Sequence, residues 1–496
     1  MTLATASGIA LVSQRLDDLQ PKGGCGGISA YYLKLLHAAG IGWAMDSMDT
    51  FLFTYCMPKI KADFKANYNR TITASESGLL GSSVFAGAFV GAFMFGYLAD
   101  AFGRRTIFLW TMIVFLVGMI LVAVSDSFGM LLTFRFVTGV GLGGELPVAS
   151  TLVQELSPKA IRGRMIVILD GFWPLGCMAA VLFANELTKS LTWRQVFFVS
   201  IAPVLYAIAL RCYIPESPKW LASVGQMGKA NSVVQSIEIA HGVYSYTAKP
   251  DVHENDPTAN VFSYGHLHLG QRIALLFRGE YFKRTLVLWT VWFGIAFAYY
   301  AIYVWLPQIV AGGSRDAFNI NGSTSSLLVI LFFQIPGYFS AACVVERIGR
   351  KLTLVLFLLC AFASALAFGY VAPTQANLMV SGSCMSFFML GAYGALYAYT
   401  PENYPTNIRA MGAAYPSGFS RIAAIAGTYV LPILHEAGWS QQEIMWLNGA
   451  ILMFCSIILF VFGYETRGKD IDDVLGMDDA AMLEDDGELF SPDEFE

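Results

Sequence analysis

Twelve stretches of about 20 mostly apolar residues limit the possible folds of this chain more than any other feature. A helix of that length crosses the hydrocarbon layer of a bilayer, and it satisfies its backbone hydrogen bonds within the segment, as lipid requires. The stretches lie at 35–58, 76–99, 106–125, 129–154, 165–187, 195–213, 286–311, 325–345, 352–371, 376–400, 410–434 and 441–463. The sequence therefore predicts an all-α membrane protein with twelve transmembrane helices.

The composition agrees with a chain whose main solvent is lipid. Of its 496 residues, 56% are hydrophobic and 14% are charged, whereas a soluble domain carries about 25% charged residues. These proportions exclude a soluble enzyme, a disordered chain and a nucleic-acid binder. The sequence also lacks a Walker lysine loop, a nucleophile elbow and an HExxH motif, so we expect neither an enzyme nor a bound cofactor or metal.

The distribution of Lys and Arg predicts how the chain sits in the membrane, because basic residues stay preferentially in the cytoplasm. With both termini cytoplasmic, 22 basic residues fall inside and seven outside. Four of the seven (Lys59, Lys61, Lys65 and Arg70) lie in the first outer loop, where they face only Asp63. We interpret this loop as solvated or in contact with headgroups, although it could also draw anions toward an outward opening. The N-terminus has no cleavable signal pattern, so no cleaved signal is expected. We expect a multi-pass protein of the cell membrane.

The longest polar connection separates the sixth stretch from the seventh and predicts a boundary between two six-helix bundles. Beyond the last stretch, the chain from Glu465 onward holds 13 acidic and two basic residues. We therefore expect five parts in chain order. They are a cytoplasmic N-terminus (1–34), a first six-helix bundle (35–213), a cytoplasmic central segment (214–284), a second six-helix bundle (285–463) and an acidic cytoplasmic tail (464–496).

Two motifs occur twice in the chain at nearly the same offset. Residues 100–105 have their counterpart at 346–351, an offset of 246, and residues 155–162 have theirs at 402–409, an offset of 247. Separate motifs that recur at one offset indicate two duplicated halves in the same orientation. Such halves pack as a pair with a cavity between them.

The repeated motifs place acidic and basic residues at the cytoplasmic ends of helices, where they can act as a gate. Gly103 and Gly349 allow a tight turn within each copy of the first motif. One exposed ion pair contributes only about 0 to 1 kcal/mol, so a network is needed to favour one state of a carrier over another. The expected gate residues are Asp100, Arg104, Arg105, Glu155, Arg162, Glu346, Arg350, Glu402 and Arg409.

These motifs and several others resemble the major facilitator superfamily over nearly the whole chain. Residues 96–105 match its signature between the second and third spans, and residues 215–221 and 465–469 look like its sugar-porter branch. Residues 46–49 and 135–147 resemble its organic-acid or metabolite:proton symporter branches. The resemblance implies the major facilitator fold, in which two pseudo-symmetric six-helix bundles enclose a central cavity.

A narrower resemblance links the chain to the bacterial nicotinate (niacin) transporter subgroup. Residues 144–150, 162–167 and 334–341 carry this likeness. Members of the superfamily share a fold while they carry very different cargo. The resemblance therefore implies a carrier, and the cargo has to be argued from individual residues.

Two aspartates in the first span are candidates for proton exchange. Asp46 and Asp49 are three residues apart, so they lie on one helix face about one turn apart. An ionised carboxylate at that depth costs several kcal/mol, and a second one nearby raises the cost of ionising both. We expect at least one of them to gain and lose a proton during transport. The alternative is that one is permanently paired with Arg135 or Arg421 and only holds helices together.

Arg135 in the fourth span and Arg421 in the eleventh are the two basic residues that the sequence places firmly inside the membrane. A guanidinium keeps its proton, so each must face a carboxylate, a bound anion or water. Arg135 matches the arginine that the family resemblance associates with proton coupling, and we group it with the two aspartates. We expect Arg421 to bind a substrate carboxylate, whereas the competing interpretation is an ion pair with Asp170 or Glu145.

The seventh span is rich in aromatic rings and supplies candidates for a substrate pocket. Tyr299 and Tyr303 are four residues apart on one helix face, and each combines a ring with a hydroxyl that could bind a polar heteroaromatic molecule. Trp173, Gln334 and Tyr393 in other spans could complete the pocket. Each of these residues alone could equally serve in helix packing.

Taken together, these residues predict a secondary active transporter that works by alternating access. We expect it to import a small organic monoanion, such as nicotinate or a related aromatic acid, by proton symport, and to act as a monomer in the bilayer. A sugar or polyol porter of the same fold is one alternative, because residues 215–221 and 465–469 also mark that branch. A non-transporting receptor or scaffold is another, although a scaffold has no use for charges buried in the membrane.

Overall fold

The computed structural model is almost entirely helical over the residues that it describes. These residues are 11–19, 28–243, 276–307, 324–370, 374–404 and 409–467. Eleven helical segments among them are long and apolar enough to cross a membrane. Helix α2 (Ala30–Tyr68), with 39 residues, is a further long helix of the bundle, and it is less apolar because its middle holds Asp46 and Asp49. With α2, the described residues contain the twelve long helical segments that the hydropathy pattern predicts.

The helices before the central segment form what we call the first half. Besides α2, they are α3 (Ala74–Phe102), α4 (Arg104–Ala123), α5 (Phe128–Leu156), α6 (Lys159–Asp170), α7 (Phe172–Leu182), a π-helical turn (Phe183–Leu187), α8 (Trp193–Val199) and α9 (Ile201–Arg211). Two short helices follow, α10 (Pro218–Ser223) and α11 (Met227–Ala240).

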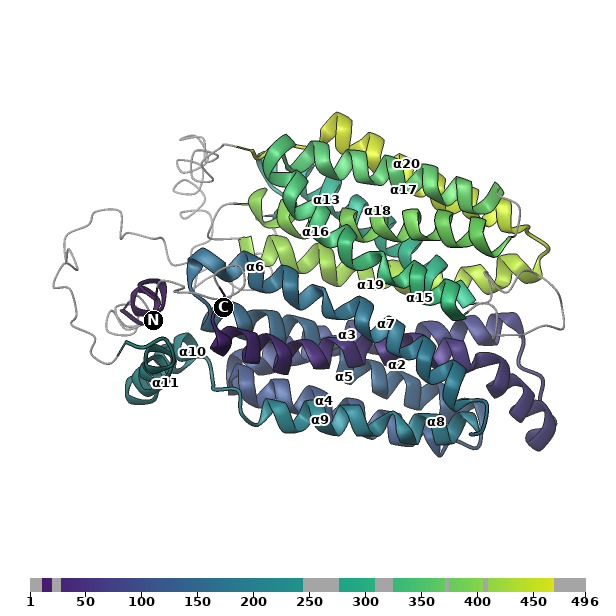
Figure 1. The fold of residues 1–496 in the computed structure, drawn as a ribbon, viewed down its shortest axis with the longest axis horizontal. Helices are drawn as coiled ribbons and strands as arrows, with labels where there is room; N and C mark the ends of the chain where they lie inside the picture. The colour runs from purple at the N-terminus through teal and green to yellow at the C-terminus, as the bar shows by residue number, and fades with distance from the viewer. Residues whose placement is uncertain are drawn as a thin grey trace, which may run out of the picture.

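The helices after the central segment form the second half. They are α13 (Gly279–Tyr303), α15 (Thr324–Phe332), α16 (Gln334–Ile348), α17 (Arg350–Tyr370), α18 (Gln375–Glu402), α19 (Arg409–Glu436) and α20 (Gln441–Phe462). The long helices of both halves run along the long axis of the molecule, and the two halves lie side by side (Figure 1). The second motif's residues 405–408 and the acidic tail from residue 468 lie outside the described residues.

The first helix is longer than the apolar pattern predicts, and this corrects the interpretation of the first outer loop. Helix α2 continues through Pro58 to Tyr68, and the next residue, Asn69, adopts a left-handed conformation with φ 48°. The carboxylate of Asp63 accepts hydrogen bonds from Trp193 Nε1, at 3.0 Å, and from Arg194. Partial burial opposes ionisation of Asp63, but these hydrogen bonds hold the pKa of its carboxyl below the usual range. The basic residues after Pro58 therefore mostly belong to a helix that is tied to α8, not to a free loop.

Three of the predicted spans are broken near their middle or start, and a proline follows each break. Helix α6 ends four residues before Pro174, α8 ends four residues before Pro203, and α15 ends four residues before Pro336. A proline has no N–H to donate to the carbonyl four residues earlier, and its ring clashes with that carbonyl. Each break therefore coincides with a proline, although the prolines inside α2, α5 and α19 are tolerated without a break.

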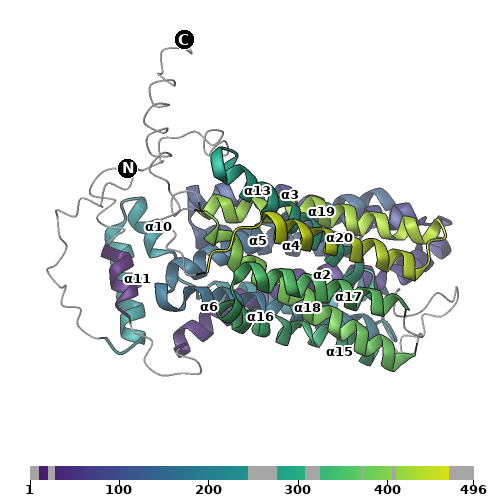
Figure 2. The ribbon, with the colours of Figure 1, turned by 90° about the horizontal axis from the view of Figure 1, so that it is seen from above.

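One end of the bundle carries α10, α11 and a short helix over residues 11–17, and we call it the α10 end (Figures 1 and 2). The short N-terminal helix lies against α11 (Figure 2). Arg15 donates from Nε and Nη2 to the two carboxylate oxygens of Glu238, at 2.9 and 2.8 Å, and from Nη1 to Asn231 at 2.9 Å. The chain before the first long helix is thus joined to the segment that follows the first half.

Candidate functional site

The two aspartates of α2 have different surroundings, although both are buried. Asp49 forms an ion pair with Arg135 of α5, with Oδ2 and Nη1 2.6 Å apart. The guanidinium carbon of Arg135 also lies 4.1 Å from the centre of the Phe53 ring. Asp46, in contrast, has no ion pair or hydrogen bond with any residue that the structure describes. The pair that the sequence left open is therefore Arg135 with Asp49, not with Asp46.

Arg421 of α19 faces Asp46 from the other half of the molecule. The two side chains interact electrostatically, and Arg421 Nη1 donates a hydrogen bond to the hydroxyl of Tyr300 at 3.3 Å. Arg421 is only half-buried. Of its five guanidinium N–H groups, one is used in a hydrogen bond to a described residue, so the guanidinium retains capacity for a further acceptor.

A buried arginine besides Arg135 corrects the sequence-based count of two basic residues inside the spans. Arg211, at the end of α9, forms an ion pair with Glu145 of α5, and both side chains are 1% exposed. Thr111 of α4 donates to the other oxygen of Glu145 at 3.1 Å. A Cβ atom at Gly42 of α2 would overlap both charged groups. The expectation that Glu145 could pair with Arg421 is therefore wrong, because Arg211 is its partner, and Asp170 makes no ion pair with Arg421 either.

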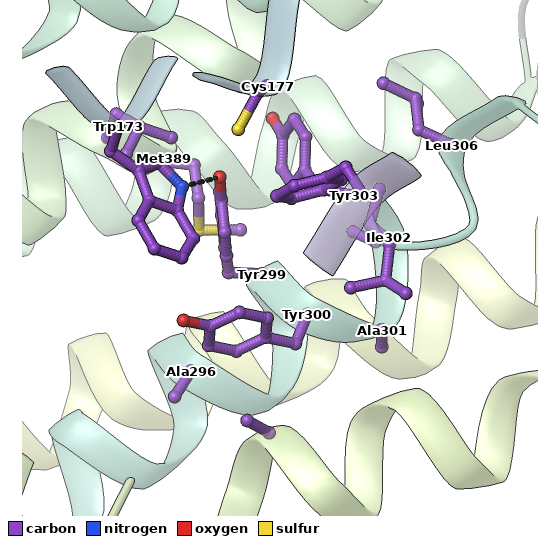
Figure 3. Close-up of a cluster of buried hydrophobic side chains, with 14 of the residues drawn as sticks. Trp173, Cys177, Ala296, Tyr299, Tyr300, Ala301, Ile302, Tyr303, Leu306 and Met389 are labelled. Carbon is purple, nitrogen blue, oxygen red and sulfur yellow. Dashed lines mark hydrogen bonds between the residues drawn. The ribbon is translucent and has the colours of Figure 1, made fainter. Parts of the chain in front are cut away.

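The predicted aromatic residues gather where the two halves meet (Figure 3). Trp173 Nε1 of α7 donates to the hydroxyl of Tyr299 of α13 at 2.8 Å, which links the halves directly. The rings of Tyr299 and Tyr303 stack with centroids 4.6 Å apart, and Tyr393 of α18 meets Tyr299 edge-on at 5.6 Å. Trp43 of α2 lies 4.8 Å from Trp173. Rings from four helices thus gather beside Tyr300, which neighbours Trp173 and Tyr299 and binds Arg421.

Gln334, the first residue of α16, is the remaining residue that the sequence assigns to the substrate pocket. Its side chain is fully buried, yet neither its amide nitrogen nor its amide oxygen has a hydrogen-bond partner among the described residues. Buried amides normally find partners, because leaving them unpaired costs about 1 to 3 kcal/mol. Gln334 therefore has hydrogen-bonding capacity that the protein itself does not use.

Sequence reasoning missed two tyrosines that link the site together. Tyr300 binds Arg421 and packs edge-on against Phe85 of α3 at 4.6 Å. Tyr397 of α18 interacts electrostatically with Arg421 and with Asp170. Helical spacing on α13 favoured Tyr299 and Tyr303 as a pair, whereas Tyr300 faces α19 and contributes separately. No pattern within α18 singles out Tyr397.

The predicted gate residues lie at the α10 end, and their ion pairs each join two helices of one half. Arg104 of α4 pairs with Glu155 of α5, with Nε and Oε2 3.3 Å apart. In the second half, Arg350 of α17 pairs with Glu402 of α18, with Nε and Oε2 2.9 Å apart. Arg105 Nη2 donates to the carbonyl of Cys212 at 2.8 Å. The side chains of three predicted gate residues lie outside the described part of the structure. They are Asp100, Glu346 and Arg409.

Arg162 holds the loop between α5 and α6. Its Nε donates to the carbonyl of Gln154 at 3.1 Å, and its Nη2 donates to the carbonyl of Ser157 at 3.3 Å. Burial and the charge of Arg162 lower the pKa of Lys219, which belongs to α10. The charge of Arg162, a gate residue of the first half, therefore acts on the short helix α10.

The two copies of the first motif have the same backbone geometry. Gly103 and Gly349 both have φ +98°, a conformation that L side chains rarely adopt. In the first half, Glu216 Oε1 accepts from the backbone N–H of Arg105 at 3.0 Å. In the second half, Glu465 Oε1 accepts from the backbone N–H of Arg350 at 3.1 Å. A carboxylate from just beyond each half thus caps a helix of that same half, where it also opposes the positive end of the helix dipole.

The chain matches the family described as "Sugar (and other) transporter" over residues 38–475. It belongs to this transporter family. The family assignment makes the chain a multi-pass membrane transporter of the major facilitator superfamily, with a small-molecule substrate, and not an enzyme.

Several relatives agree with membership of the Sugar (and other) transporter family. The niacin transporter NiaP of Acinetobacter baylyi is 35% identical over 449 residues, which cover 90% of this chain and 97% of the relative. The organic cation/carnitine transporter 7 of Arabidopsis thaliana is 27% identical over 484 residues, covering 90% and 94%. The inward-open, partially occluded structure of the xylose transporter XylE from E. coli superimposes with a TM-score of 0.68 at 16% identity, covering 89% of this chain and 100% of that one. At this identity the last likeness shows the shared fold alone.

In this family member the two halves also meet at the end opposite α10. Ser75 at the start of α3 and the hydroxyl of Tyr429 on α19 are 3.1 Å apart. A Cβ atom at Gly78 would lie 2.7 Å from the backbone oxygen of Tyr429, so the two helices approach closely there. The halves are thus in contact at that end and around the aromatic residues.

Proposed function

We propose that the chain imports a small organic monoanion, such as nicotinate or a related aromatic acid, together with protons and by alternating access. One observation carries this proposal: Arg421 and Asp46, neither of which forms an ion pair with a described residue, face each other from the two halves beside aromatic rings. A carrier of an anion and a proton requires both a cationic site and a protonatable site at the interface that opens alternately.

Arg421 would hold the carboxylate of the substrate. A guanidinium forms strong paired hydrogen bonds with a carboxylate, and Arg421 uses one of its N–H groups on Tyr300. The rings of Trp173, Tyr299 and Tyr393 would pack against an aromatic substrate, and the unused amide of Gln334 could bind a polar atom on it. The name of the Acinetobacter baylyi relative supports nicotinate as the acid.

Asp46 would carry the coupled proton. With no substrate, the charge of Arg421 would favour the ionised form of Asp46. When the carboxylate of the substrate neutralises Arg421, Asp46 loses its countercharge and takes up a proton, so that one anion and one proton load together. One anion and one proton carry no net charge together, so the membrane potential does no work on the loaded carrier, and each unit of pH gradient supplies about 1.4 kcal/mol.

Asp49 and Arg135 would support this coupling from α2 and α5. Their ion pair fixes the helix that carries Asp46, and it places a second carboxylate one turn away. We propose that the pair responds to the protonation of Asp46, because the charge on one aspartate raises the cost of ionising the other.

The gate residues would act at the cytoplasmic side, which we assign to the α10 end. The ion pairs Arg104 with Glu155 and Arg350 with Glu402 each join two neighbouring helices of one half. Their formation and loss during transport would change how these helix ends pack. Contact between the halves at the opposite end, through Ser75 and Tyr429, supports a state that faces the α10 end.

Uptake into proteoliposomes with an inward proton gradient tests the proposal. Labelled nicotinate should accumulate, benzoate-type acids serve as comparison, and hexoses should not accumulate. The double variant Asp46→Asn with Asp49→Asn should abolish gradient-driven accumulation, while the control Glu186→Gln, an exposed residue paired with Lys189, should not. Accumulation of a hexose alone would favour the sugar-porter alternative that the family description also allows. Equal uptake with and without the gradient would contradict proton symport.

A further inference from the structure

We infer that Asp170 hydrogen-bonds the ring nitrogen of the transported acid, so that the site selects N-heteroaromatic acids over carbocyclic ones. This inference rests on the proposed function, which it makes more specific. It would assign the two ends of one small molecule to two residues: the carboxylate to Arg421 and the ring nitrogen to Asp170.

Asp170 lies at the break in the fifth span, at the level of the aromatic residues. It is the last residue of α6, and it comes three residues before Trp173, whose indole binds Tyr299 of the other half. Pro174 has no N–H to donate to the backbone carbonyl of Asp170, so the regular pattern of helical hydrogen bonds is interrupted there. The Asp170 residue is only 4% exposed.

The carboxyl group of Asp170 has no ion pair and no hydrogen bond with any residue that the structure describes. Among the buried acids of the described chain, Asp49, Glu145 and Glu238 each have an arginine partner. Asp46 has Arg421 as an electrostatic neighbour, whereas Asp170 has no such neighbour among the basic residues that the structure describes. A buried carboxyl group without a partner is unfavourable, so a ligand that supplies a partner is bound more tightly.

Tyr397 connects Asp170 with the proposed substrate position at Arg421. The groups that it affects electrostatically are Tyr338 of α16 and Tyr397 of α18, so it faces the second half. Tyr397 also interacts electrostatically with Arg421, so one tyrosine lies within reach of both charged residues. The hydroxyl of Tyr397 is engaged by Ser417, which leaves Asp170 free for another partner.

A carboxyl group matches a pyridine-type nitrogen in either protonation state. A protonated Asp170 donates to the lone pair of the neutral ring nitrogen, and an ionised Asp170 accepts from the N–H of the protonated ring. A benzene ring presents a C–H at the same place and leaves the carboxyl group unpaired. A site built to hydrogen-bond one atom of a substrate rejects the analogue that lacks it more strongly than a site that only fits its shape.

Equilibrium binding to the purified full-length protein in proteoliposomes tests this inference, with labelled nicotinate and labelled benzoate as the two probes. The unmodified protein should bind nicotinate about tenfold to a hundredfold more tightly than benzoate. Asp170→Leu should remove most of this preference by weakening nicotinate, while the affinity for benzoate is unchanged and shows that the variant is folded. Asp170→Asn should keep part of the preference, because a carboxamide can donate to the ring nitrogen. Glu186→Gln serves as the matched control and should keep all of it.

Three results would overturn the inference. If Asp170→Leu left the ratio of the affinities for nicotinate and benzoate unchanged, Asp170 would not recognise the ring nitrogen. If the unmodified protein bound neither acid, the proposed function would fail, and this inference would fail with it. Tight and equal binding of both acids by the unmodified protein would contradict only the role of Asp170 and would leave the proposed function standing.

Discussion

Arg135 Nη1 and Asp49 Oδ2 lie 2.6 Å apart, and neither side chain is more than 1% exposed. The pair joins α2 to α5 inside the first half. The second oxygen of Asp49 and two nitrogens of Arg135 have no hydrogen-bond partner among the described residues. A buried pair of this kind adds little net stability, but the loss of one partner leaves a charge that lipid and protein cannot solvate.

Arg135→Gln should therefore destabilise the protein by about 3 to 5 kcal/mol, because it leaves Asp49 as a buried charge without a countercharge. The double variant Asp49→Asn with Arg135→Gln should recover a large part of this loss, since it removes both charges. Thermal unfolding of the detergent-purified protein measures the effect. Equal losses for the single and the double variant would show that the charges do not act as a pair.

Arg421→Gln should weaken nicotinate binding about tenfold to a hundredfold, because the substrate carboxylate loses a charged hydrogen-bonding partner. Arg421→Lys should recover part of the affinity, since it restores the charge without the planar fork. Tyr300→Phe removes one neutral hydrogen bond to Arg421 and should cost about threefold to tenfold. Radioligand binding measures all three, and an unchanged affinity in Arg421→Gln would place the carboxylate elsewhere.

The Glu145 and Arg211 pair leaves no room for a side chain at Gly42. Gly42→Ala should destabilise the protein by about 1 to 3 kcal/mol, because the new methyl group overlaps both charged groups. Gly129→Ala is the matched control, since a Cβ atom there meets nothing within 4 Å. Thermal unfolding compares the two, and similar midpoints would mean that α2 can move away from the pair at little cost.

Arg104→Gln should slow transport more than it weakens substrate binding. The variant loses the ion pair with Glu155, which lies between α4 and α5 and is remote from Arg421. Initial uptake rates and equilibrium binding of nicotinate separate the two effects. A large loss of binding with an unchanged translocation rate would contradict the gate assignment.

Glu238→Gln should release residues 11–19 from α11, because it removes the charge that Arg15 binds with two hydrogen bonds. Backbone hydrogen exchange in that segment should become faster, while exchange in α3 and α5 stays unchanged. Lys229→Gln, an exposed change on the same helix, is the control. Unchanged exchange in residues 11–19 would show that apolar contacts alone hold the N-terminal helix.

The parts of this molecule that depend on local sequence could be predicted, and those that depend on long-range pairing could not. The apolar stretches give the long helices, and the repeated glycines Gly103 and Gly349 share one unusual backbone angle, as their common motif suggests. The partner of Glu145 was not predictable, because Arg211 lies 66 residues away at the end of a span, where it resembles a residue of the cytoplasmic loop. The position of Asp170 depends likewise on how α6 and α18 face each other.

The length of α2 shows a second limit of sequence patterns. Polar residues after Pro58 end the hydropathy signal, but they do not end the helix, because Pro58 is tolerated and the helix continues to Tyr68. Hydropathy reports the lipid environment of a segment, whereas helix ends depend on capping and on contacts such as those of Asp63 with α8.

The carboxylates of Glu216 and Glu465 give each half a closing contact that comes from its own trailing segment. Neither half borrows this cap from the other. Two polypeptides translated separately, one ending after α11 and the other starting before α13, should find each other in the bilayer and rebuild the carrier.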